Sequence, residues 1–289
     1  MAFRTDLACE ARKIWENSAQ STTKLTGVRA EDRVFQGLDG ELVEILNEEG
    51  ARALGKPVGT YLSLELSRDR QQGATALAEG LETLLGPSGE GNVLVVGLGN
   101  RAMTPDALGP LAAQGIFVTR HLTVHMPPLG LRPVCALTPG VLGTTGVESL
   151  EVVRSVVDRV RPERVIVVDA LAAGERRRLC TTVQLTDTGI VPGSGVGNHR
   201  HPLNQDTLGI PVLSIGVPTV VDAATVAADL LEQSGVADID PERLRQGDSM
   251  FVTPKDIDAQ VRDLAKVVGY AIDWAVQDLE IEEITALLS

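Results

Sequence analysis

Aromatic residues are scarce in this chain of 289 residues, at 3 % of the sequence, and positive charge is in the minority. Lys and Arg total 26 against 39 Asp and Glu, which gives a formal net charge of −13. Few aromatic side chains leave little surface for stacking on bases, and a negatively charged protein is repelled by a phosphate backbone. The composition therefore argues against nucleic-acid binding as the main activity, and we expect no direct nucleic-acid partner.

Cysteine and long apolar runs are also in short supply. The three cysteines, Cys9, Cys135 and Cys180, form no C-x-x-C pair, so the sequence indicates neither a disulfide framework nor a cysteine zinc site. No stretch of about 18 uncharged apolar residues is present, and the first residues do not resemble a signal peptide. We therefore expect a protein of the reducing cytoplasm with no membrane partner.

Alternating strands and helices form the main pattern from residue 61 onward. The runs YLSLEL, NVLVVGLG, RVIVVDA, TTVQLT and GIPVLSIG are typical of strands, and the intervening DRQQGATALAEGLETLLG and VESLEVVRSVVDRVRP have helical periodicity. We also expect helices at ATVAADLLEQSG and over 254–288, whereas residues 1–60 show only a helical pattern around 7–17. This alternation predicts an α/β protein with a mostly parallel sheet covered on both faces. We expect one domain spanning residues 1–289, because 43 % hydrophobic residues in a chain of this length suffice for one large core.

Two acidic residues follow two of the predicted strands. Asp106 lies in TPDALGP, shortly after NVLVVGLGN, and Asp169 directly follows Val168 at the end of the apolar run RVIVV. Ligands of open α/β sheets bind outside the carboxyl ends of the strands. The two carboxyl groups are therefore candidates to face one substrate bond.

The local sequence predicts different ionisation for these two acids. Thr104 and Pro105 indicate a helix start, where an acid in the first turn is favoured by the helix dipole and stays ionised; this also gives Asp106 a purely structural interpretation. Asp169 emerges from a buried strand, where loss of water would raise its pKa. One neutral and one ionised carboxyl group could activate a water molecule against a peptide carbonyl, as in aspartic proteases.

Two other interpretations use the same part of the sequence. Gly97 to Ala102 fits G-x-G-x-x-A, a dinucleotide-binding pattern, but Pro105 places the helix start too late and no acidic residue stands at the expected distance after it. Alternatively, the two acids and one of the histidines could hold a divalent metal. The four histidines are His121, His125, His199 and His201.

Long stretches of the sequence resemble the germination protease family of spore-forming bacteria. The matching segments are RTDLACEA, VVGLGNRAMTPDALGP, FVTRHL, LRPVCALTPGVLGTTGVES, VVDALAA, DTGIVPGSGVGN, LGIPVLSIGVPTVVDA and FVTPKDID, spread from residue 4 to about residue 258. The resemblance implies a three-layer α/β/α, phosphorylase/hydrolase-like fold similar to the hydrogenase-maturation endopeptidases. It also implies an atypical aspartic-type endopeptidase whose catalytic residues are Asp106 and Asp169.

The same resemblance implies a substrate, an assembly and a form of control. The substrates would be small acid-soluble spore proteins, cut during germination in the spore core or forespore cytoplasm by a homotetramer, with no cofactor and no metal. Members of the family are made as zymogens with an N-terminal propeptide, but here RTDLA begins at Arg4, so only Met1 to Phe3 precede it. Two alternatives remain beside this interpretation: a metal-dependent endopeptidase of the hydrogenase-maturation type that uses the same acids as ligands, and a spore-protein-binding relative that does not cut.

The Gly-rich loop after TTVQLT is the candidate site for the extended substrate backbone. Loops rich in special backbone conformations often carry function. We expect five of its residues to bind substrate: Gly193, Ser194, Gly195, Gly197 and Asn198. The family resemblance also implies cleavage at acidic-apolar sites, and an acidic enzyme would need local positive charge to bind them; the candidates are Arg101, Arg120, Arg132 and Arg200, with Arg101 preferred.

Overall fold

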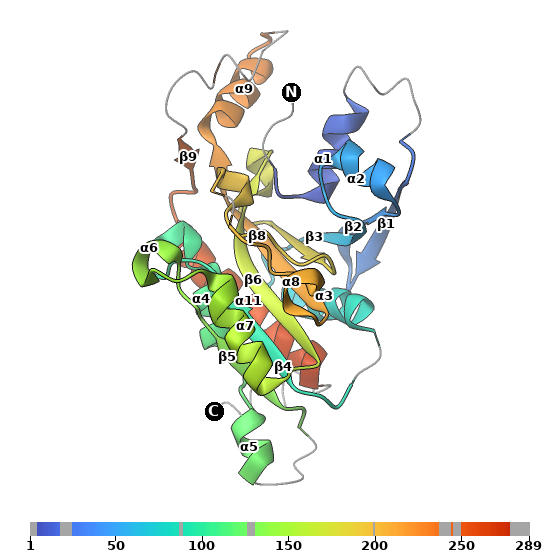
Figure 1. Cartoon of the computed structure of the whole chain (residues 1–289). Helices are drawn as coiled ribbons and strands as arrows, with labels where there is room; N and C mark the ends of the chain where they lie inside the picture. The colour runs from blue at the N-terminus through green and yellow to red at the C-terminus, as the bar shows by residue number, and fades with distance from the viewer. Residues whose placement is uncertain are drawn as a thin grey trace.

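The computed structural model describes residues 5–17, 25–86, 89–125, 131–198, 200–236, 244 and 250–277. Within these residues one nine-stranded sheet has the order β1-β2-β3-β7-β8-β6-β4-β5, with β9 paired to β8 (Figure 1). The strands are β1 (Val28–Phe35), β2 (Leu38–Ile45), β3 (Gly59–Glu65), β4 (Val93–Gly97), β5 (Val134–Leu137), β6 (Arg164–Ala173), β7 (Thr182–Thr186), β8 (Val212–Asp222) and β9 (Phe251–Val252). The helices are α1 (Ala8–Glu16), α2 (Glu48–Leu54), α3 (Arg70–Leu85), α4 (Leu108–Gln114), α5 (Arg120–His125), α6 (Leu142–Thr145), α7 (Ser149–Val160), α8 (Gln205–Leu208), α9 (Ala223–Gln233) and α11 (Ile257–Gln277), with 3-10 turns η1 (Thr104–Asp106), η2 (Arg176–Arg178) and η3 (Ser194–Val196).

The parallel part of the sheet consists of β5, β4, β6 and β8. Its central strands are apolar and buried on both faces, which is why they read as continuous hydrophobic runs. β6 and β8 run on past the predicted segments to Ala173 and Asp222. The carboxyl ends of β4, β6 and β8 therefore meet at one end of the sheet.

Antiparallel strands extend this parallel part on one side. β7 pairs with β8, and β3, β2 and β1 follow it, each antiparallel to its neighbour, so that the sheet as a whole is mixed. The β1–β2 hairpin turns at Gln36 and Gly37, whose φ angles of 47° and 80° suit a tight hairpin turn. Residues 25–60, which carried little pattern in the sequence, thus complete the sheet.

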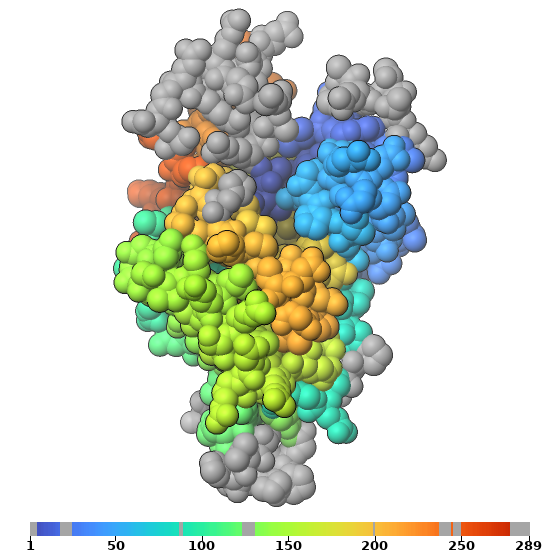
Figure 2. All heavy atoms as spheres, viewed as in Figure 1, coloured from blue at the N-terminus to red at the C-terminus, as the bar shows by residue number. Residues whose placement is uncertain are grey.

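Helices cover both faces of the sheet, as the α/β/α prediction requires. One apolar cluster lies between the sheet and α3, α4 and α11, and contains alternate residues of β4 and β6 such as Val95 and Ile166. The residues between them, such as Leu94 and Val165, face the other way and pack with α7 and α8, while α1 and α2 cover β2 and β3. Figure 2 shows α7, α8 and α2 on the face turned toward the viewer. Among the described helices, none is both long and apolar enough to cross a membrane.

Two glycines set how closely α4 approaches the sheet. A methyl group at Gly109, in the first turn of α4, would overlap the carbonyl oxygens of Leu98 and Val168. Likewise, a methyl group at Gly97, the last residue of β4, would overlap the Gly109 carbonyl. The backbones of β4, β6 and α4 are therefore in direct contact, and this contact places the residues just before α4 beside the end of β6.

Replacement of Gly109 by alanine is expected to lower the free energy of unfolding by about 2–3 kcal/mol, because the added methyl group meets rigid backbone. Urea denaturation followed by circular dichroism measures this change. The matched control is Gly143→Ala in α6, where the new methyl group meets no atom within 4 Å. Equal stability of the two variants would contradict the close approach of α4 to the sheet.

Candidate active site

A cleft of about 570 Å³ lies at the carboxyl ends of β4, β6 and β8. Its lining includes four carboxyl groups from distant parts of the chain: Asp6, Asp106, Glu148 and Asp169. The structure thus brings together the two acids that the sequence singled out and adds Asp6 and Glu148. The location is the one expected for ligands of open α/β sheets.

Asp106 is half-buried at the end of η1, just before α4. The backbone N–H of Asn100 donates a hydrogen bond of 2.7 Å to its Oδ2, and the positive φ of Gly99 (112°) lets the loop pass over the carboxyl group. Burial raises the pKa of Asp106, and the Asn100 hydrogen bond opposes this. The turn at Thr104 is a 3-10 turn that leads into α4 at Leu108, so the α-helix begins a few residues later than the sequence predicted.

Asp169 lies within β6, and its residue is 5 % exposed. Burial raises its pKa well above the ordinary value, and the negative charges of Asp106 and Asp6 raise it further, against a 2.9 Å hydrogen bond from the Ala170 backbone N–H. The direction agrees with the sequence prediction. A proton bound at this site is therefore held mainly by Asp169, with Asp106 the more readily ionised of the two.

Asp6 is a residue of the cleft that the sequence argument did not select. Its carboxylate accepts hydrogen bonds from the Ala172 backbone N–H (2.9 Å) and from the Ser194 hydroxyl (2.8 Å). A side chain at Gly195 would overlap this carboxylate. Asp6 thus joins the N-terminal segment to β6 and to the Gly-rich loop. The one signal that pointed to it was its place in the RTDLACEA segment that resembles the family.

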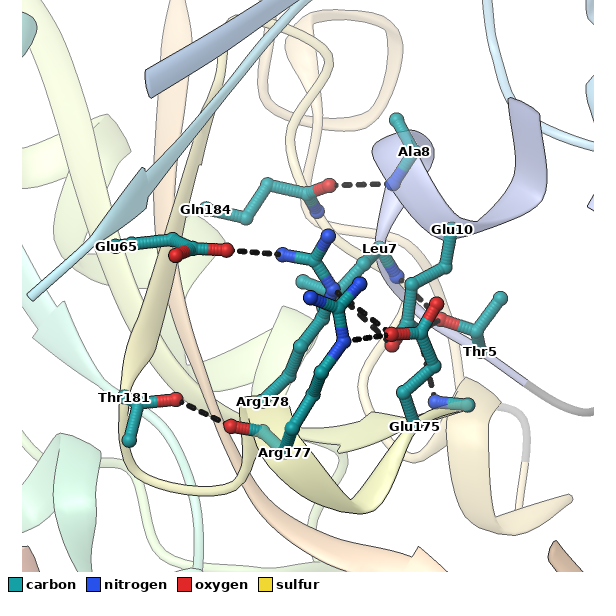
Figure 3. A network of polar contacts seen from close by, with 11 residues as sticks. Thr5, Leu7, Ala8, Glu10, Glu65, Glu175, Arg177, Arg178, Thr181 and Gln184 are labelled. Carbon is teal, nitrogen blue, oxygen red and sulfur yellow. Dashed lines mark hydrogen bonds and ion pairs between the residues drawn. The ribbon is translucent and has the colours of Figure 1, made fainter. Parts of the chain in front are cut away.

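Buried polar contacts fix the N-terminal segment beside the cleft (Figure 3). Glu10, which is 1 % exposed, accepts a hydrogen bond from the Gly174 backbone N–H (2.7 Å) and another from the Thr5 hydroxyl. The guanidinium group of Arg178 lies 3.5 Å from the same carboxyl group, and Gln184 accepts a hydrogen bond from the Ala8 backbone N–H (2.7 Å). Since these partners are the residue directly after β6 and residues of η2 and β7, the start of the chain is part of the site's framework.

The predicted substrate-binding residues divide between neighbouring cavities. Gly193, Ser194, Gly195 and Asn198 line the cleft, whereas Gly197 lines a second cavity beside it. Arg101 lines a separate adjoining depression of about 490 Å³ and donates a hydrogen bond to Gln114.

Of the other three candidate arginines, Arg200 lines the cleft, and its guanidinium group lies 3.9 Å from the Glu148 carboxyl group. Arg120 lies in α5, next to the amino end of β5. Arg132 lies outside the cleft lining and forms an ion pair of 3.0 Å with Glu163. The structure therefore does not bring Arg120 or Arg132 to the site where the sequence argument placed them.

The histidines proposed as metal ligands have no described place in the cleft. His121 lies on α5 and His201 is exposed outside the cleft lining; the His125 side chain and His199 lie outside the described residues. Within the part of the chain that the structure describes, no group of three or more His, Cys, Asp or Glu side chains is arranged to hold a metal ion.

Comparison with known proteins gives the family. Residues 6–234 match the germination protease family. The chain belongs to that family. It is 39 % identical to the germination protease of Clostridium perfringens over 99 % of both chains, and 38 % identical to that of Clostridium tetani over the full length of both. A further germination protease, from a Geobacillus species, is 43 % identical over 80 % of this chain and 67 % of its own. Membership of this family identifies the chain as a protease.

Among solved structures, the chain is similar to the [NiFe] hydrogenase maturation protease HycI from Thermococcus kodakarensis KOD1. The TM-score is 0.38 at 19 % sequence identity, over 67 % of this chain and 98 % of the other. The α/β/α class follows from the sheet and helices of the chain itself.

Proposed function

We propose that this protein is an endopeptidase that starts the degradation of small acid-soluble spore proteins, with Asp106 and Asp169 as a water-activating pair. One observation carries the proposal. Two carboxyl groups line the same cleft, and burial, together with the charge of Asp106, raises the pKa of Asp169, as expected for two carboxyl groups that share one proton.

In this mechanism the two groups exchange protons with water and the scissile bond. Ionised Asp106 removes a proton from a water molecule, whose oxygen forms a bond to the carbonyl carbon, while protonated Asp169 donates its proton to the carbonyl oxygen. The tetrahedral intermediate then collapses: Asp106 gives its proton to the leaving nitrogen, the C–N bond breaks, and Asp169 recovers a proton from the hydroxyl group. Atoms and charge balance, and both groups return to their starting states.

The proposed substrate, compartment and assembly rest on the family resemblance. Small acid-soluble spore proteins would enter the cleft as an extended chain beside Gly193, Gly195 and Asn198, in the spore core or forespore. We propose that the protein assembles as a homotetramer. Light scattering tests the assembly, since a tetramer has four times the 30.6 kDa mass of the chain; a monomer mass would reject it.

The first test of the proposed activity is mass spectrometry of a small acid-soluble spore protein incubated with the purified protein and excess chelator. Discrete fragments from cleavage at one or a few sites are expected. Cleavage that appears only after a divalent metal is added would replace the carboxyl-pair mechanism by a metal-dependent one. An intact substrate in both conditions would contradict the proposed activity of the purified chain.

A further inference from the structure

A second cavity, of about 580 Å³, lies next to the cleft on the same face of the sheet as α1, α2 and α8. Five residues line both spaces: Asp6, Leu171, Val191, Ser194 and Gly195. The second cavity therefore adjoins the cleft directly along these residues.

Lys56 supplies the positive charge of this second cavity. It follows α2 and its C-cap Gly55, and both residues are part of the cavity lining. The Lys56 ammonium group makes no hydrogen bond and no ion pair of 4 Å or less within the described residues. Burial lowers the pKa of Lys56, while the charges of Asp6 and Glu10 oppose this effect. A half-buried ammonium group without a close anion can gain a strong interaction from an incoming carboxylate.

Neutral donors line the cavity on the sheet side. Ser214, on β8, is 2 % exposed, and its buried hydroxyl has no hydrogen-bond partner within the described part of the chain. Its register partner on β7 is Thr186, whose hydroxyl shares a hydrogen bond of 2.9 Å with Thr188. An unpaired buried hydroxyl group is uncommon in a native protein, and that of Ser214 is free to donate a hydrogen bond within the cavity that it lines.

We propose that this second cavity is a specificity pocket in which Lys56 and Ser214 bind the carboxylate of an acidic side chain of the peptide held in the cleft. One cation and several hydroxyl donors match a carboxylate, which accepts hydrogen bonds and donates none. In the cleft, Asp106 and Asp169 repel an acidic side chain, and the guanidinium group of Arg200 in its lining already lies 3.9 Å from the Glu148 carboxyl group. Asp6 lines both spaces, but the second cavity adds the Lys56 ammonium group, which has no close anion among the described residues.

This inference rests on the proposed endopeptidase activity. Comparing an acidic peptide with its amide variants tests the pocket separately from the activity. The probes are a short synthetic peptide that spans the first bond cut in the spore protein and variants of it in which each acidic residue is changed in turn to its amide. In the wild-type protein, one of these changes is expected to lower kcat/KM roughly 10- to 100-fold, the usual value of a charge-assisted hydrogen bond. In Lys56→Met the same change is expected to have less than about a 2-fold effect, because the partner charge is already gone.

Two further variants distinguish binding from folding. Lys266→Met removes the same charge from the exposed side of α11, on the opposite face of the sheet, and is expected to keep the wild-type preference. Ser214→Ala is expected to fold normally, because its hydroxyl has no partner to lose, and to lower kcat/KM for the acidic peptide roughly 2- to 10-fold.

The outcomes are separate for the two proposals. If the wild-type protein cuts no peptide, the proposed activity fails before Lys56 is tested. If it cuts, but Lys56→Met loses the same factor on the acidic and amide peptides, the specificity pocket is rejected. If free glutarate inhibits the wild-type protein and not Lys56→Met, while no amide change in the peptide matters, the pocket binds a free carboxylate and the peptide side chain is excluded as its occupant.

Discussion

Asp169→Asn is expected to lower kcat for peptide cleavage roughly 10²- to 10⁴-fold, the range typical of a general acid or base. Asparagine keeps the shape of the side chain but cannot hold or donate the transferable proton. The fold should remain, since burial disfavours the charged form of Asp169 and the amide removes that cost. Asp106→Asn is expected to cause a loss of similar size, because it removes the group that takes the proton from water. Initial rates on the spore protein, with circular dichroism of each variant, measure both effects.

Asp158→Asn is the matched control for these two variants. Asp158 is an exposed residue of α7 and does not line the cleft, so its substitution should leave the rate unchanged. The pH dependence gives a second check: activity needs Asp106 ionised and Asp169 protonated, so it should fall at low pH and again as pH rises through the pKa of Asp169. Full turnover by Asp169→Asn would remove this residue from the mechanism.

A second large effect concerns stability and arises at Asp273 on α11. This residue is 1 % exposed, and burial raises its pKa to about 7, although the Phe117 backbone N–H donates to its carboxyl group at 3.0 Å. Between pH 4 and 7 the folded protein then holds a proton that the unfolded chain has released. Stability therefore falls as pH rises through this window, by about 4 kcal/mol in total at 1.36 kcal/mol per pKa unit.

Asp273→Asn should remove this pH dependence, because asparagine stays neutral. Its stability is expected to lie within about 1 kcal/mol of the wild type at pH 4 and to exceed it by about 4 kcal/mol at pH 8. Urea denaturation at both pH values measures the difference. Asp263→Asn, an exposed position on the same helix, should shift stability little at either pH. If the stability difference between Asp273→Asn and the wild type does not increase from pH 4 to pH 8, ionisation of Asp273 does not destabilise the folded protein.

The central strands and the two carboxyl groups beyond them were predictable because burial on both faces leaves a direct trace in sequence. NVLVV and RVIVV are continuous apolar runs. The second run stops at Asp169, although β6 itself continues to Ala173, and Asp106 follows a few residues after the end of β4. The Gly-rich loop was predictable for a similar reason, since its backbone conformations need glycine, as at Gly193 (φ 74°) and Gly197 (φ 75°).

Features that depend on distant pairing were not predictable in the same way. β1 is exposed along most of its length and carries four charged residues, so VRAEDRVF shows no buried face. Asp6 reaches the cleft through partners 166 and 188 residues away, and no local spacing encodes these contacts. Lys56 likewise stands out only after folding places α2 beside β7 and β8. A carboxylate or ammonium group held by tertiary contacts is invisible to periodicity.

The cleft draws its walls from almost the whole length of the chain, from Asp6 at the start to Thr253 near the end. In the sheet, β3 pairs with β7, and β8 lies between β7 and β6. Strands made early in translation therefore cannot complete their pairing until later strands have been made. A ribosome that adds 5–20 residues per second needs roughly 13–50 s to reach Thr253. Throughout that time the cleft of the nascent chain is incomplete, so proteolytic activity can begin only after residue 253 has been synthesised and folded into place.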